Sequence, residues 1–182
     1  MNRAYRLIIN HYLLAVFSLT LVASLTVTTG NVTGAERISL QESQIIVASS
    51  AQVLLKQNTT TTLLNYCATT FKHLSKSAQK SATGWQMKHA QIVNKADKIN
   101  RYVANTIEKY DSIFAAEKFY LKIDSQVYDS TQIFKAEIAN KSRKQQHYFC
   151  NRLILSTAMG EWDLVNVIPE HVQRVKSFKL KN

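Results

Sequence analysis

The longest regular pattern of apolar and polar positions in this chain runs from Trp85 to Leu121. Its apolar residues recur at steps of three, four or seven, which place them on one face of an α-helix. They are Ile92, Ala96, Ile99, Val103, Ile107, Tyr110, Phe114 and Leu121. A helix of this span would be about 55 Å long. An isolated helix is only marginally stable in water, so we expect other segments to pack along it.

Two shorter helical patterns precede this stretch. Residues 39–42 fit a capping box, in which Ser and Glu side chains bond free backbone groups, and predict a first helix over 40–57. A polar, threonine-rich break at 58–62 separates it from a second helix over 61–80. The inner face of the second helix would carry Leu63, Cys67, Phe71 and Leu74. Residues 83–86 match a second capping box, which predicts the start of the long helix.

After the long helix the chain is expected to reverse between 123 and 131, where two Asp-Ser pairs favour turns. One continuous helix through this region is the alternative, since no Gly or Pro interrupts it. The reversal is favoured because the helices of a compact domain must cover one another. A fourth helix is predicted over 130–159, with Gly160 as its C-terminal cap. The chain should then be extended through Ile168, and Pro169 should start a short last helix.

The composition agrees with this pattern. One Pro and four Gly are few for a β-rich or loop-rich protein. The sequence therefore predicts an all-α fold, a bundle of about four helices built along one long central helix. Residues 36–182 provide enough chain for one domain.

Residues 1–35 have the layout of a secretory signal. Two arginines precede an uncharged run over 12–27, and small and polar residues follow as far as Ala35. Cleavage after Ala35 would release the domain. Retention would leave residues 7–27 as an inner-membrane anchor, because this run is long enough to span a bilayer. Either outcome exports residues 36–182, so the predicted location is periplasmic or secreted.

Cys67 and Cys150 are the only cysteines, and each lies beside an apolar stripe of a predicted helix. In an oxidising compartment this arrangement predicts a disulfide between the second and fourth helices. Two buried free thiols are the alternative. A disulfide here would close a long loop, and chain entropy puts its contribution at about 4 to 5 kcal/mol.

The formal net charge is +11, and loss of the two leader arginines would leave +9. A surplus of this size favours anionic partners. Lysines recur every fourth residue in the second predicted helix, which places them on one face. The residues assigned to this basic face are Lys72, Lys76, Lys80, Lys88, Arg143 and Lys144. An ordinary solvated surface is the alternative interpretation.

The sequence contains no motif that indicates catalysis or a cofactor. No two histidines are four residues apart, and the nucleophile elbow, the haem attachment sequence and the Gly-rich phosphate loop are all lacking. An enzyme is therefore not favoured, and we assign no catalytic residue, metal ligand or cofactor.

The expected function is that of an exported, non-catalytic binding or adaptor module of the cell envelope with a basic docking face. Its partner would be an anionic envelope component or an acidic protein, with the inner membrane added if the leader is retained. Nucleic acid is not expected, because the leader removes the chain from the cytosol. The alternative is a small-ligand sensor or carrier whose pocket lies between the helices.

Overall fold

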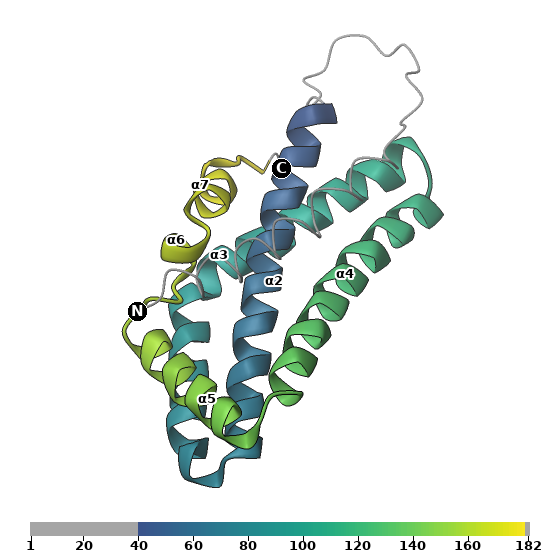
Figure 1. Ribbon diagram of the computed structural model, residues 1–182. Helices are drawn as coiled ribbons and strands as arrows, with labels where there is room; N and C mark the ends of the chain where they lie inside the picture. Colours follow the sequence, from purple (N-terminus) through teal and green to yellow (C-terminus); the bar gives the residue numbers. More distant parts are fainter. Residues whose placement is uncertain (1–39, 181–182) are drawn as a thin grey trace.

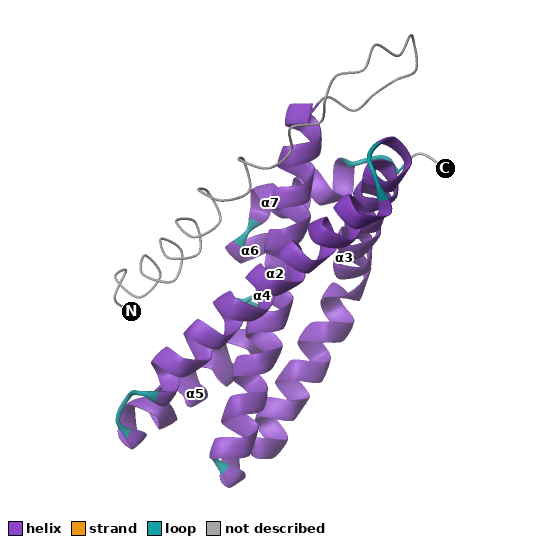
Figure 2. Cartoon of the chain, turned by 90° about the vertical axis from the view of Figure 1, so that its right-hand side faces the viewer, coloured by secondary structure: helices purple, strands orange, loops and turns teal. Residues whose placement is uncertain are grey.

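The computed structural model describes residues 40–180, and this segment is helical apart from short turns, as predicted for an all-α protein (Figure 1). The helices follow one another without an intervening strand in the described range (Figure 2). In chain order they are α2 (Leu40–Thr70), the 3₁₀ turn η2 (Lys72–Leu74), α3 (Ser75–Tyr110), α4 (Ile113–Ala139), α5 (Arg143–Ala158), α6 (Leu164–Val167) and α7 (Pro169–Ser177).

The predicted signal or anchor in residues 1–35 lies outside the described residues. Within residues 40–180, no helix is both long and apolar enough to cross a bilayer.

Helix α2 is the most deeply enclosed element. It contacts α3, α4, α5 and α7 and runs through the middle of the molecule in Figure 1. Residues 49–53 are all buried, so neighbours cover every side of α2 at this level. The prediction of a bundle along a central helix over 85–121 is therefore not confirmed, because α2 takes the central position. A helix buried on all sides has no single apolar stripe, which is why its sequence pattern is weak.

Helix α3 corresponds to the predicted long helix but occupies different residues. It begins at Ser75, so the predicted capping box at 83–86 lies inside the helix. It ends at Tyr110, and the chain turns at Asp111 and Ser112. The Ser112 hydroxyl accepts a hydrogen bond from the backbone N–H of Ala115 at 3.1 Å, which caps α4. The predicted stripe is buried as far as Val103, whereas Tyr110, Phe114 and Leu121 are exposed.

The predicted break at 58–62 is wrong, because α2 continues through the threonines. The Thr61 hydroxyl donates to the backbone carbonyl of Gln57 at 2.9 Å, within the same helix. Thr59 is buried, and its hydroxyl meets that of Thr131 on α4 at 3.3 Å. Burial between helices thus outweighs the weak helix propensity of threonine. The chain instead turns after Thr70, so the predicted second helix over 61–80 is divided between α2, η2 and α3.

The reversal predicted at 123–131 is also wrong. Ile123, Val127 and Thr131 form the buried stripe of α4, which is continuous. The turn comes instead at residues 140–142, where Ser142 caps the shorter α5 with its side chain.

After α5 the structure agrees with the predicted glycine cap and the predicted start of the last helix, but not with the predicted extended segment. Gly160 follows α5 with a φ of 79°, which suits the predicted glycine cap. Residues 164–167 form the single turn α6 rather than the expected extended segment, and Pro169 begins α7 as predicted.

The two cysteines are paired in the structure. The Cys67–Cys150 disulfide joins α2 to α5, with a Cα–Cα distance of 5.4 Å. Both cysteines are fully buried in an apolar cluster that includes Leu64, Phe71 and Leu153. The sequence prediction of this pair is confirmed, and the bond joins the last turn of α2 to the middle of α5.

Substitution of Ile99 tests the buried face of α3. Ile99 is fully buried in the cluster with Trp85 and Leu164, so Ile99→Ala should lower the free energy of unfolding by about 2 to 4 kcal/mol. Lys98→Ala, at the exposed neighbouring position, should change it by less than about 0.5 kcal/mol. Denaturant titrations of both variants measure this, and equal effects would show that the buried face is misassigned.

Removal of the disulfide tests its contribution. The bonded residues are 83 apart in sequence, so Cys67→Ala/Cys150→Ala should lower the free energy of unfolding by about 4 kcal/mol. Intact-mass measurement of the wild-type chain should show two hydrogens fewer before reduction than after it. Free alkylation of both thiols in denatured, unreduced protein would contradict the pairing.

Candidate functional site

Two features of the structure are candidates for function, and the first is a basic end. The α2–α3 connection and the α4–α5 turn meet at the lower end of the molecule in Figure 1. The exposed lysines on these segments are Lys72, Lys76, Lys141 and Lys144, and we call this set the basic end. None of them forms an ion pair with a described residue. The chain has no Asp or Glu between Glu42 and Asp97, so the positive charge is not balanced locally.

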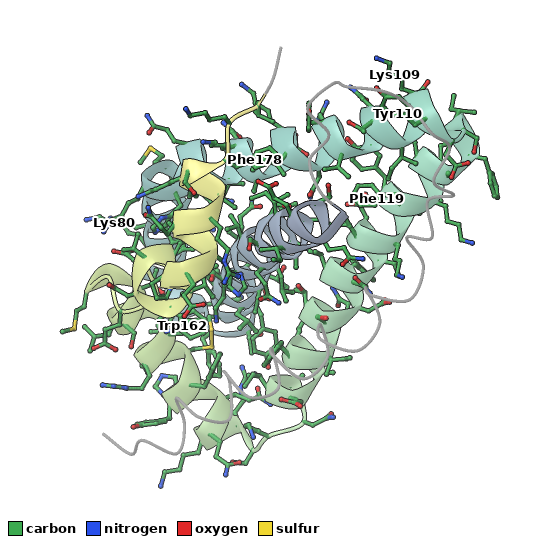
Figure 3. All side chains as sticks on the ribbon, turned by 90° about the horizontal axis from the view of Figure 1, so that it is seen from above. Lys80, Lys109, Tyr110, Phe119, Trp162 and Phe178 are labelled. Carbon is green, nitrogen blue, oxygen red and sulfur yellow. A yellow bond between two sulfur atoms is a disulfide. The ribbon has the colours of Figure 1, made fainter. Side chains whose placement is uncertain are left out.

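The six residues predicted for the basic face do not all lie together. Lys72 belongs to η2, and Lys76 lies on the first turn of α3, so the lysines do not share one helix as predicted. Lys80 projects outward from the next turn of α3 (Figure 3). Helix α5 begins with Arg143 and Lys144, and Arg143 reaches the end of α2 next to η2. Lys88 lies elsewhere on α3.

Arg143 is held by the fold. Its guanidinium donates a hydrogen bond to the backbone carbonyl of Thr70 at 2.7 Å and lies 4.2 Å from the centre of the Phe71 ring. The bond satisfies one of the carbonyls left free at the end of α2, and the stacking adds a cation–π contact. Arg143 therefore joins α5 to the end of α2 and is less available to a partner than the lysines around it.

Two histidines meet at the same end. The Nε2 atoms of His73 and His147 lie 2.9 Å apart, and both rings pack edge-on against Phe71. A hydrogen bond between two ring nitrogens requires that one of them lacks a proton. The pair is invisible in sequence, because its members are 74 residues apart.

Lys88, an exposed residue, bonds to the buried Asp163 beyond the other end of α5. Its amine lies 2.5 Å from one carboxylate oxygen of Asp163, and Nε2 of His89 lies 3.0 Å from the other. Burial alone would raise the pKa of Asp163, but hydrogen bonds and charge from Lys88 and His89 outweigh it and lower that pKa. The Trp85 indole N–H also donates to the carbonyl of Trp162 at 2.9 Å. These contacts fix the turn between α5 and α6 on α3.

The second candidate feature is Lys56 on α2, which sequence reasoning missed. Only 2% of this residue is exposed, and its amine lies 4.9 Å from the centre of the Trp162 ring. No hydrogen bond or ion pair joins the amine to any described residue. Burial lowers the pKa of Lys56 from 10.5 to about 8. The available signal was a lone lysine directly after the apolar run Val53 to Leu55.

No known protein family, curated protein or solved structure matches this chain. The functional argument therefore rests on the geometry of these two features. The described residues contain no group of three or more His, Cys, Asp or Glu side chains arranged to hold a metal ion.

The buried charge of Lys56 should make stability depend on pH. Because its pKa is lower in the folded state, the folded protein binds this proton more weakly than the unfolded chain does. The resulting cost is full below about pH 8 and disappears as the pH rises to 10.5. At pH 7, Lys56→Met should therefore raise the free energy of unfolding by about 3 kcal/mol.

Denaturant titrations of wild type and Lys56→Met between pH 7 and 10.5 measure this difference, which should shrink with rising pH. Lys98→Met, an exposed control on α3, should differ little from wild type throughout. A constant difference across this range would show that folding does not lower the pKa of Lys56.

Proposed function

We propose that this protein is an exported, non-catalytic binding or adaptor module that docks on an anionic component of the cell envelope through its basic end. The observation that carries the proposal is the convergence of Lys72, Lys76, Lys141 and Lys144 from separate segments, without a carboxylate partner among residues 40–180. Exposed charges of one sign attract a polyanion over a distance and hold it through many weak contacts. The Cys67–Cys150 disulfide fits an oxidising compartment.

The direction of α2 bears on the partner. This helix has 31 residues and is about 45 Å long, and its first residue lies at the opposite end of the molecule from the basic end (Figure 1). If residues 7–27 are retained in the inner membrane, the helix that follows them in the described chain places its full length between its first residue and the basic end. An anionic cell-wall polymer or an acidic protein is therefore favoured over the lipid surface of the anchoring membrane.

Salt and charge substitution test this docking. The domain should co-sediment with purified cell wall at low ionic strength and lose binding steeply as salt rises, because exposed charges are screened. Replacement of Lys72, Lys76 and Lys144 by Gln should weaken binding by up to about 100-fold, at about 1 kcal/mol for each lysine near an anionic surface.

Matched controls make the test specific. Replacement of the exposed lysines Lys98, Lys118 and Lys176 by Gln removes the same charge away from the basic end. This control should bind much better than the basic-end variant, and anionic lipid vesicles should sediment less protein than cell wall does. An equal loss of cell-wall binding in both triple variants would reject the basic end as the docking surface. Binding that does not change with salt concentration would reject it as well.

A further inference from the structure

Lys56 is a buried lysine that forms no ion pair with any residue of the described range 40–180. Buried lysines are rare, and those that occur are normally paired. Its contact within the described chain is the face of Trp162, at 4.9 Å, which provides weak attraction and no hydrogen-bond acceptor. The Trp162 ring therefore leaves the three N–H donors of the amine without an acceptor from this contact.

The register of α2 against α5 shows what lies near this amine. Tyr66 donates to Gln146 at 3.0 Å, and Cys67 is bonded to Cys150. Lys56 precedes Tyr66 and Cys67 on α2, and its amine contacts the ring of Trp162, which follows Gln146 and Cys150 in the chain. The two segments therefore run antiparallel. Positions between Lys56 and Cys67 on α2 face positions between Cys150 and Trp162.

Two unpaired hydroxyls lie in this interval. Thr60 is one turn beyond Lys56 on α2, and Thr157 is in the last turns of α5. Both residues are buried, at 0% and 7% exposure, and neither hydroxyl has a hydrogen-bond partner within the described part of the chain. Other buried threonines do find one, as Thr131 does by donating to the carbonyl of Val127 at 2.8 Å. An unmade hydrogen bond of a buried hydroxyl costs stability.

An ammonium and two hydroxyls, all unpaired, match the needs of a carboxylate, which offers two oxygens and about four acceptor positions. The same interface is otherwise apolar, with Leu63, Leu64 and Leu153 in the adjoining cluster. We propose that the contact between α2 and α5 binds the carboxylate of a small apolar carboxylic acid, with Lys56 as its cationic partner and Thr60 and Thr157 as further donors.

Trp162 provides a signal for binding. It is half-buried on the turn between α5 and α6, and its ring lies 4.9 Å from the Lys56 amine. A ligand that binds the amine changes the surroundings of this ring, so tryptophan fluorescence should report binding. The site is separate from the basic end, and neither proposal depends on the other.

The experiment titrates the oxidised, full-length protein with sodium acetate, butanoate and octanoate at pH 7, against sodium chloride at equal ionic strength. Melting temperature and tryptophan emission are both followed. We expect a saturable rise in melting temperature and a saturable change in emission with the acids but not with chloride. Each added methylene should lower the Kd by about fourfold until the available space is filled, from about 0.8 kcal/mol per buried methylene.

Variants assign the response to the site. Lys56→Met should fold stably and lose the saturable response, and Lys98→Met should keep it. Thr60→Val/Thr157→Val preserves side-chain shape and should weaken binding several-fold. The triple Lys→Gln variant of the basic end should bind the acids normally, which separates this site from envelope docking.

Three results would overturn the proposal. They are the absence of a saturable response to any of the acids, a response of Lys56→Met equal to that of wild type, and a response to chloride equal to that of the acids. The last would show a general anion effect rather than recognition of a carboxylate.

Discussion

The burial of α2, which is enclosed on all sides at residues 49–53, is the constraint on which the rest of this structure depends. Four other helices contact α2, and each of them buries a face against it. Apolar side chains fill most of these contacts, but Ser49, Ser50 and Gln52 are buried as well. Their polar groups need partners inside the protein, and Ser50 finds one by donating to the side-chain carbonyl of Asn100 on α3. The position of α3 along α2 is therefore fixed by a specific polar contact as well as by apolar packing.

Sequence reasoning succeeded where a signal is local or periodic. The stripe through Ile92, Ile99 and Val103 identified α3, because an exposed helix face makes the apolar period visible. Pro169 and Gly160 marked a helix start and a helix end through their backbone chemistry. The helix boundaries failed where tertiary burial decided them. The threonines 59–62 were read as a break, yet hydrogen bonds within α2 and burial against its neighbours keep them helical.

The candidate sites were predictable only in part. Lysine counts indicated a basic surface, but the fold decides which cations remain available, because Lys88 is taken by Asp163 and Arg143 by the end of α2. The burial of Lys56 could not be predicted, since a sequence of polar and apolar residues does not show how many helices enclose a position. The His73–His147 contact is likewise created by tertiary structure alone.

The disulfide also has a consequence for the order in which the protein assembles. Its two cysteines enclose the rest of α2 beyond Cys67, all of α3 and α4, and half of α5. Synthesis proceeds from the N-terminus, so α2 is complete long before the helices that cover it exist. Cys67 has no partner within the chain until residue 150 has emerged, so the bond can form only after α3 and α4 have been synthesised. Oxidation of this single pair is therefore a late event, and it secures α5 in its place beside α2.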